Sequence, residues 1–119
     1  MQEATRDEVA ARLDDPALIV LDVRSLDEYE GRLGAACCAR QGRIPGARHL
    51  DLVELMEMDA AAIHERLGAP EGVEVIAYCH SGNRSAMAAQ LLRAAGYDAR
   101  NYPGSWHEWS RDATLPAEP

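Results

Sequence analysis

The sequence lacks any apolar run that approaches the ~20 residues of a membrane-spanning helix. Its first segment, MQEATRDEVAARL, is charged rather than apolar, so no secretory signal is predicted. Basic residues are scarce, since 12 arginines and no lysine stand against 20 acidic residues, and the net charge is −8. Nucleic-acid binding needs a basic face, so this class of partner is disfavoured. We therefore expect a cytoplasmic protein with no nucleic-acid or membrane partner.

Cysteine is also scarce, and its number is odd. The three cysteines are Cys37, Cys38 and Cys79. An odd number without an export signal argues against a disulfide framework and for a reducing compartment, where a cysteine is available for chemistry. The adjacent Cys37 and Cys38 have neither CxxC spacing nor a nearby histidine, so the sequence predicts no metal site. Two interpretations of this pair stay open: cysteines without a function, or thiols that resolve an oxidised or persulfidated Cys79.

The order of the apolar segments indicates one α/β domain over residues 1–119. With 47% hydrophobic and 27% charged residues, the chain fits a single globular core. Strands are expected over residues 18–23, 49–52, 73–78 and 98–102. Helices are expected over residues 5–13, 25–31, 53–58, 60–67 and 84–95. Residues 32–43 are expected to form a surface excursion, that is, an irregular segment outside the core. This alternation favours a largely parallel sheet, which binds ligands at the carboxyl ends of its strands. The expected buried face of the helix over 84–95 is Met87, Leu91, Leu92 and Ala95.

Cys79 stands between one of these strands and the helix that follows. The intervening loop is polar and contains glycine, which places the cysteine at a rim rather than inside a core. Backbone N–H groups at the start of a helix stabilise a thiolate and any anion attached to its sulfur. Gly82 lets the backbone curl without a Cβ clash, and Arg84 adds positive charge. The pattern favours a cysteine nucleophile over the alternative of a buried structural cysteine.

Five short segments, taken together, identify a family that the chain resembles. They are Val20-Leu21-Asp22-Val23-Arg24 with Glu28-Tyr29, Gly42-Arg43-Ile44-Pro45-Gly46-Ala47, Tyr78-Cys79-His80-Ser81-Gly82-Asn83-Arg84-Ser85, Gly96-Tyr97 and Tyr102-Pro103-Gly104-Ser105-Trp106. In this order and spacing they resemble the rhodanese family of sulfurtransferases, from about Arg6 to Trp109. The ending over 104–109 is most similar to thiosulfate and mercaptopyruvate sulfurtransferases.

The resemblance implies a fold and a reaction. The fold is a three-layer α/β domain with a central, mostly parallel, five-stranded sheet and helices on both faces. In the reaction, Cys79 takes sulfur from a small anionic donor such as thiosulfate or mercaptopyruvate, and a thiol or cyanide acceptor removes it from the resulting persulfide. No metal or organic cofactor is implied. An alternative of a different class is a persulfide carrier or regulatory module that hands sulfur to a protein partner.

A cysteine phosphatase or an arsenate reductase is the competing enzymatic interpretation, because such phosphatases share this fold. They place five residues between the cysteine and the arginine, which makes a loop wide enough for a tetrahedral phosphate. Here four residues separate Cys79 from Arg84. The family resemblance links this shorter loop to sulfur transfer, so we favour a sulfurtransferase.

The remaining candidate residues are assigned from the same resemblance. The loop expected to bind the donor and the persulfide is His80, Ser81, Gly82, Asn83, Arg84 and Ser85. Asp22 and Arg24 are expected to form a supporting ion pair, and the expected pocket residues are Trp106, Arg32 and Arg43, with Arg40 as a further cation. Two departures weaken the case for thiosulfate as the donor. Ser81 stands where thiosulfate enzymes often carry lysine, and Glu28 stands where the two-domain enzymes carry arginine.

Overall fold

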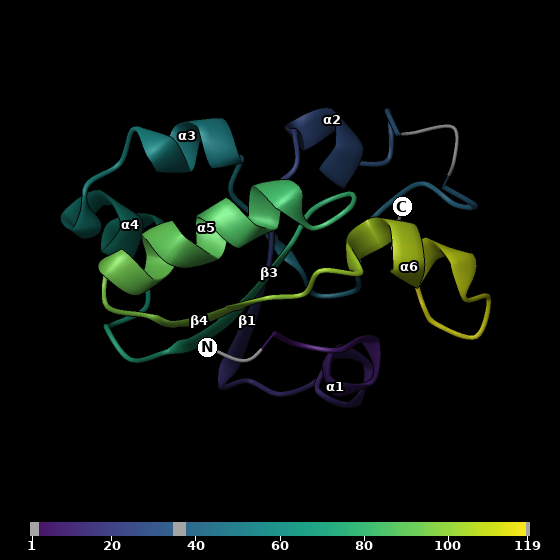
Figure 1. Cartoon of the computed structure of the whole chain (residues 1–119), viewed down its shortest axis with the longest axis horizontal. Coiled ribbons are helices and arrows are strands. Elements are labelled where there is room, and N and C mark those ends of the chain that lie inside the picture. Colours follow the sequence, from purple (N-terminus) through teal and green to yellow (C-terminus); the bar gives the residue numbers. More distant parts are fainter. Residues whose placement is uncertain (1–2, 35–37, 119) are drawn as a thin grey trace.

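The computed structural model describes residues 3–34 and 38–118, and a parallel sheet forms its centre (Figure 1). The strands β1 (Leu18–Asp22), β2 (Arg48–His49), β3 (Glu74–Tyr78) and β4 (Asp98–Asn101) lie in the order β2-β1-β3-β4, all parallel. Leu18 pairs with Glu74 and Asp22 with Tyr78, so β1 and β3 end at the same level. The strand order reverses direction between these two strands, and open α/β sheets bind ligands at such a point.

Helices cover both faces of this sheet, as expected for an α/β domain. They are α1 (Arg6–Ala11), α2 (Leu26–Tyr29), α3 (Leu52–Met56), α4 (Ala60–Leu67), α5 (Asn83–Ala94) and α6 (Ser105–Arg111). The helices α3, α4 and α5 cover one face, and α1 and α6 cover the other (Figure 1). No described helix has the length and apolar character needed to cross a membrane.

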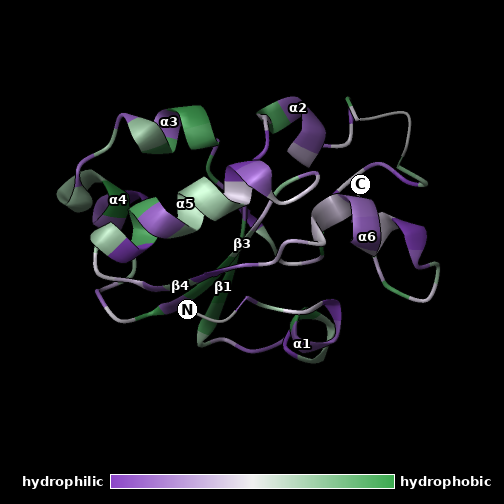
Figure 2. Ribbon diagram, viewed as in Figure 1, coloured by the Kyte–Doolittle hydropathy of each residue, from purple (hydrophilic) through white to green (hydrophobic). Residues whose placement is uncertain are grey.

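The central strands are apolar throughout because each of their faces contributes to a separate core. Leu21 and Ala77 pack into the core under α3, α4 and α5. Val20 and Ile76 point the other way, into the core that also buries Trp106. Successive side chains of a strand alternate between faces, so a sheet covered on both sides needs an uninterrupted apolar sequence. Figure 2 shows this as hydrophobic colour along β1 and β3.

The lengths of several elements differ from the sequence-based expectations. The described part of the chain contains four strands where five were expected. The strand expected over 49–52 is shorter, because Asp51 accepts a hydrogen bond from the Val53 N–H and starts α3. Residues 105–111, to which no element was assigned, form α6. Two boundaries lie close to their predicted positions. One is the carboxyl end of the strand expected over 98–102, and the other is the start of α1 at its N-cap, Thr5.

The buried face of helix α5 agrees in part with the predicted one, since Leu92 and Ala95 are buried and Leu91 packs against the same core. Its buried residues are Ser85, Ala88, Ala89 and Leu92, which follow helical i, i+3, i+4, i+7 spacing. Met87 is 46% exposed, so its assignment to the buried face was wrong, whereas Leu92 and Ala95 are buried as predicted. At the first turn of the helix the buried face begins with Ser85, whose hydroxyl faces the sulfur of Cys79.

Candidate active site

Cys79 lies at the carboxyl end of β3, beside the end of β1. At 1% exposure it packs with the core residues under α3, α4 and α5, so the prediction of a rim position outside the core was wrong. The backbone N–H of Gly82 donates a hydrogen bond to the sulfur at 3.1 Å, and that of Ser85 does so at 3.4 Å. The Ser85 hydroxyl lies 3.3 Å from the same sulfur. The loop and the first turn of α5 therefore surround the sulfur with donors, as the order of strand, loop and helix predicts.

These donors determine the ionisation of the thiol. Burial raises the pKa of Cys79, but hydrogen bonds from the Ser85 side chain and from the backbone N–H groups of Ser85, Gly82 and Ser81 together outweigh it. The net pKa is therefore below the usual value for cysteine. A thiolate that accepts several N–H bonds at a helix N-terminus is a reactive nucleophile.

The Ser85 hydroxyl has two acceptors for one proton. Its oxygen lies 2.6 Å from Oδ1 of Asn101 and 3.3 Å from the Cys79 sulfur. The Asn101 amide is held in this orientation because its Nδ2 donates to the Gly82 carbonyl at 3.2 Å. Asn101 therefore competes with the sulfur for the Ser85 proton. Asn101 was not predicted as a site residue, because it lies on β4, 16 residues beyond Ser85.

Ser85→Ala is expected to shift the pH dependence of sulfur transfer. The side chain of Ser85 is the largest of the influences that lower the pKa of Cys79, so its removal raises that pKa. Thiolate is present above the pKa and is lost as the pH falls through it. The rising limb of kcat/KM against pH should therefore move to higher pH, with the largest loss of activity on its acidic side.

Ser81→Ala provides the matched control for this pH profile. Ser81 lowers the pKa of Cys79 through its backbone N–H, which alanine retains. The rising limb of its profile should lie at the same pH as that of the unmodified chain, whatever change Ser81→Ala makes to donor binding. If the rising limb of the Ser85→Ala profile stays at the same pH and activity falls equally at every pH, the assigned role of the hydroxyl is contradicted.

Ser105 also reaches the site from a distant segment. Its hydroxyl oxygen accepts the Cys79 backbone N–H at 3.0 Å and donates to the Tyr102 carbonyl at 2.8 Å. It has a φ of 54°, the only positive φ among the described residues other than glycine. Such backbone strain is concentrated at functional sites. The segment Gly104-Ser105-Trp106 was the signal for it in the sequence, although no site role was assigned to Ser105.

Gly82 is required by the shape of the loop. Its φ is 95°, and a Cβ built on it would lie 2.6 Å from the carbonyl oxygen of Pro103. The clash is with backbone, which no side-chain rotation relieves. The requirement for glycine at position 82 therefore has a second reason, which is the close approach of the Pro103 backbone.

Gly82→Ala is expected to lower the free energy of unfolding by about 2–4 kcal/mol, from left-handed strain of about 1–2 kcal/mol and overpacking of similar size. Chemical denaturation measures this. Gly72→Ala is the matched control, because Gly72 has a φ of 88° but no atom within 4 Å of the place that a Cβ would occupy. That variant should lose only the strain component of about 1–2 kcal/mol. Equal losses in the two variants would show that the contact with Pro103 is unimportant.

Arg84 supplies less positive charge to the sulfur than the sequence suggests. Its guanidinium forms two hydrogen bonds with the carboxylate of Glu28 on α2, at 3.0 and 3.3 Å. Burial raises the pKa of Glu28, but the bonds from Arg84 and Ser25 outweigh this effect, and the net pKa is lowered. Glu28 is therefore an ionised carboxylate beside the Cys79 loop, and it neutralises Arg84.

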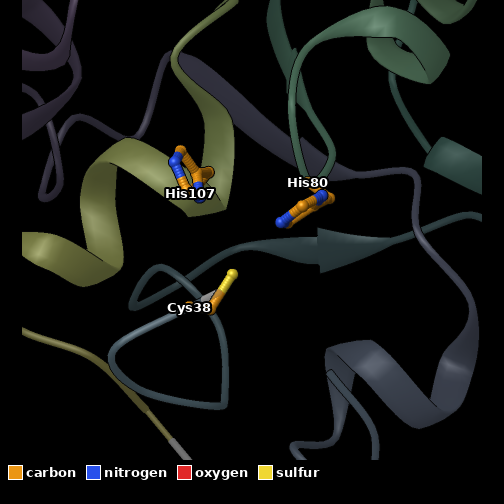
Figure 3. A group of neighbouring side chains, drawn as sticks. All are labelled: Cys38, His80 and His107. Carbon is orange, nitrogen blue, oxygen red and sulfur yellow. The ribbon is translucent and has the colours of Figure 1, made fainter. Parts of the chain in front are cut away.

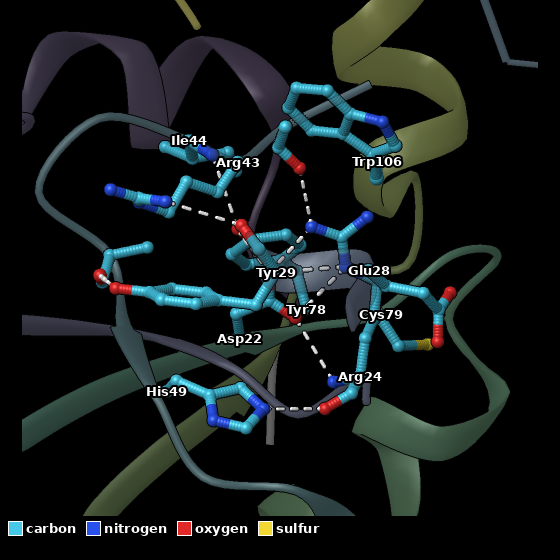
Figure 4. Close-up of polar contacts among 12 residues, drawn as sticks. Asp22, Arg24, Glu28, Tyr29, Arg43, Ile44, His49, Tyr78, Cys79 and Trp106 are labelled. Carbon is cyan, nitrogen blue, oxygen red and sulfur yellow. Dashed lines mark hydrogen bonds and ion pairs between the residues drawn. The ribbon is translucent and has the colours of Figure 1, made fainter. Parts of the chain in front are cut away.

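Asp22 and Arg24 form the expected ion pair, with 0% and 1% of their side chains exposed (Figure 4). The Arg24 guanidinium donates to both carboxylate oxygens of Asp22 and to the Gly42 carbonyl. The Tyr78 hydroxyl donates to Asp22 at 2.8 Å and accepts the Ile44 N–H at 3.1 Å. The pair thus joins the ends of β1 and β3 to the segment that precedes β2.

The predicted pocket residues lie elsewhere. Trp106 is 1% exposed and packs against the Arg24 guanidinium, whose carbon lies 5.3 Å from the ring centroid. Arg32 pairs with Asp27 and Glu30 on the surface, and Arg43 lies over the Tyr29 ring. Trp106, Arg32 and Arg43 thus make other contacts here, and their role in a donor pocket stays a prediction.

A cavity of about 660 Å³ opens beside the loop at Ser81 instead. Its lining consists of Arg6, Ser81, Pro103, Gly104, His107, Glu108, Arg111, Asp112 and Ala113. Ser81 and Asn83 are exposed, and His80 is half-buried. Ser81 is the residue of the predicted loop that lines this cavity, and Cys79 is not part of the lining. The other lining residues were not predicted as site residues.

Comparisons with known proteins agree with this architecture. The sequence pattern described as Rhodanese-like domain matches residues 5–112. The thiosulfate sulfurtransferase of Azotobacter vinelandii is 32% identical over 124 residues, which cover 97% of this chain and 45% of the relative. The human thiosulfate:glutathione sulfurtransferase is 35% identical over 98 residues, or 76% of each protein.

A solved structure agrees as well. The crystal structure of a probable thiosulfate sulfurtransferase superposes with a TM-score of 0.84 at 45% identity, covering 98% of this chain and 47% of that one. The chain thus spans about half the length of this protein and of the Azotobacter relative. From the sequence pattern, the relatives and the shared fold, this chain belongs to the rhodanese-like domain family.

Proposed function

We propose that this chain is a sulfurtransferase that carries sulfur as a persulfide on Cys79. The observation that supports it is the set of donors around the Cys79 sulfur, from the Gly82 and Ser85 backbone and the Ser85 hydroxyl. A persulfide ends in an anionic sulfur, and preorganised N–H and O–H groups stabilise such an anion. The names of the relatives support the same class of reaction.

The first half-reaction starts from the Cys79 thiolate. Its lone pair attacks the outer sulfur of the donor and forms a new S–S bond. With thiosulfate, the bond between the two donor sulfurs breaks and its electron pair leaves with sulfite. The charges balance, because a monoanion and a dianion give the persulfide monoanion and the sulfite dianion. No proton or external electron is required.

The second half-reaction regenerates the thiolate. A nucleophilic acceptor such as cyanide or a thiolate attacks the terminal sulfur of the persulfide. The S–S bond breaks and its electron pair returns to Cys79, while cyanide leaves as thiocyanate. This covalent route divides one transfer between two substrates into two simpler displacements.

The contacts of Arg84 argue against phosphate transfer. A phosphatase needs its loop arginine to bind two oxygens of the phosphate, yet Arg84 is held by the Glu28 carboxylate. Glu28 also adds negative charge beside the loop, which repels a phosphate dianion. The four-residue spacing and this ion pair therefore favour a sulfur substrate over a phosphate ester.

Mass spectrometry tests the proposal. The protein is incubated with thiosulfate or mercaptopyruvate, desalted and measured intact, and Cys79 is then located in peptides. A gain of one sulfur on Cys79 that cyanide removes is the expected result. Formation of this persulfide with slow turnover in solution would favour the carrier alternative. If neither donor adds sulfur to Cys79, the proposal is wrong.

The charge of Glu28 is expected to set the preference between donors. Glu28→Gln keeps an acceptor for the Ser25 cap but removes the negative charge and releases Arg84. We expect kcat/KM for thiosulfate, a dianion, to rise about fivefold, which corresponds to about 1 kcal/mol for a partly buried charge near the site. The rise should be smaller for mercaptopyruvate, a monoanion. Steady-state kinetics with both donors measures the difference.

Asp27→Asn is the control for this charge effect. Asp27 is the neighbour of Glu28 on α2, but it is 56% exposed and pairs with Arg32 on the surface. Water screens such a charge, so kcat/KM should change little with either donor. An equal gain for both donors in Glu28→Gln would contradict an electrostatic origin.

A further inference from the structure

Cys38, His80 and His107 come together from three separate segments of the chain. One ligand atom from each, a sulfur and two ring nitrogens, lies within 4.8 Å of the others. Figure 3 shows the Cys38 sulfur directed toward the space between the two imidazole rings. The rings meet edge to face, with centroids 5.6 Å apart. The cluster adjoins the persulfide site, because His80 directly follows Cys79 and His107 lines the cavity beside Ser81.

Backbone contacts hold the three segments in place. The His107 N–H donates to the His80 carbonyl at 2.9 Å, which fixes α6 against the Cys79 loop. The Trp106 ring N–H donates to the Arg40 carbonyl at 2.9 Å, which fixes the segment that carries Cys38 against α6. The Arg40 guanidinium also binds carbonyl oxygens at the end of α6, among them that of Asp112 at 3.0 Å. Hydrogen bonds made by groups other than the three side chains of the cluster thus hold the three segments together.

We propose that Cys38, His80 and His107 bind Zn²⁺ as three protein ligands with an open fourth position. One thiolate and two imidazoles form a donor set suited to zinc rather than to Mg²⁺ or Ca²⁺, which prefer oxygen ligands. Zinc–ligand bonds of about 2.0–2.3 Å place tetrahedral ligand atoms roughly 3.3–3.6 Å apart. The present separations, up to 4.8 Å, need side-chain rotations that bring the atoms about 1 Å closer.

His107 contributes an independent observation. Its Nδ1 is buried and has no hydrogen-bond partner among the described residues. An unpaired buried nitrogen is costly, and coordination through Nδ1 satisfies it. Nε2 then carries the proton, so its long contact of 3.4 Å with the exposed Arg111 guanidinium is released. Arg111 can turn to solvent because its contact with the ring lies at the surface.

The sequence did not predict this site because its ligands are far apart along the chain. In the sequence, no histidine stands near Cys37 and Cys38. The loop after β3 brings one histidine to Cys38, and α6 brings the other. Cys37 lies outside the described residues, so neither of its two open interpretations is decided.

Cobalt titration of the tag-free protein tests the proposal. Co²⁺ replaces Zn²⁺ in tetrahedral sites, and a thiolate ligand adds a charge-transfer band in the near ultraviolet. The Cys79→Ser background removes the reactive thiolate as a competing ligand. We expect one equivalent of Co²⁺ to bind with this band and with intense visible absorption, and one equivalent of Zn²⁺ to displace it.

Ligand variants make the test specific. In the same background, Cys38→Ser should lose the charge-transfer band, and His107→Asn should bind at least about 100-fold more weakly, since even outer-sphere changes cost about 10–100-fold. His107 is half-buried, so its variant is expected to fold, and circular dichroism checks this for each protein. Cys37→Ser and His64→Asn are the controls and should bind as the background does. A band that persists in Cys38→Ser, or no cobalt binding in a folded background, would overturn the proposal.

Discussion

Cys79→Ser is expected to reduce sulfur transfer from thiosulfate to cyanide by at least about 1000-fold, the scale seen when a covalent nucleophile is removed. Serine has no thiolate to attack the donor, and a hydroxyl is barely ionised at neutral pH. The side chains that contact the sulfur in the described part of the chain are also hydroxyls, Ser85 on α5 and Ser105 on α6, so neither replaces the thiolate. Thiocyanate production in the steady state measures the loss.

The loss should not come from unfolding. Serine differs from cysteine by one atom, and its oxygen can accept the bonds that Gly82 and Ser85 donate to the sulfur. The melting temperature is therefore expected to change little. Cys37→Ser is the matched control and should leave turnover nearly unchanged. Activity within tenfold of the unmodified chain in Cys79→Ser would rule out a persulfide on this residue.

The features that the sequence predicted are those with local causes. A continuous apolar run followed by polar residues and glycine specifies a buried strand that ends at a loop, and Cys79 occupies that end. Gly96 ends the helix because its φ of 98° is accessible to glycine. Asp22 and Arg24 pair because they are two residues apart on one strand end. In each case, the structural feature is explained by residues that are neighbours in the sequence.

The features that the sequence did not predict depend on contacts between distant segments. Asn101 enters the site because β4 pairs with β3, and Ser105 enters because α6 follows β4. The buried face of α5 includes Ser85 and two alanines, which hydrophobicity alone does not single out, and Met87 was misassigned for this reason. Arg32 and Arg43 were chosen for their charge, whereas their contacts with Asp27 and with the Tyr29 ring become visible only in the fold.

The buried ion pair gives the largest expected effect on stability. Asp22→Ala should lower the free energy of unfolding by about 3–5 kcal/mol, because it leaves the Arg24 guanidinium buried without its counter-charge. In the unmodified chain, burial and the Asp22 charge raise the pKa of Tyr78, so its hydroxyl keeps its proton and donates to Asp22. In Asp22→Ala this hydroxyl also loses its acceptor. A domain of this size has only about 5–15 kcal/mol to lose. Urea unfolding, followed by fluorescence, measures the change.

The Asp27–Arg32 pair provides a surface comparison for the same substitution. Asp27→Ala removes an aspartate whose partner is 58% exposed, so water replaces the lost contact and the cost should be about 0–1 kcal/mol. Equal losses in Asp22→Ala and Asp27→Ala would show that burial is not what makes the Asp22 pair important.

Replacing both partners separates support of the fold from a direct role in catalysis. In Asp22→Leu/Arg24→Met, no unpaired charge remains, so the double variant should be more stable than Asp22→Ala. Arg24 is 1% exposed and donates to Asp22 and to the Gly42 carbonyl, so it has no surface open to a substrate. We therefore expect any loss of kcat/KM in Asp22→Ala to follow from its lower stability, and both quantities to recover in the double variant. If stability recovers while kcat/KM stays low, the positive charge of Arg24 acts on the Cys79 loop through space, and its role extends beyond holding β1 and β3 together.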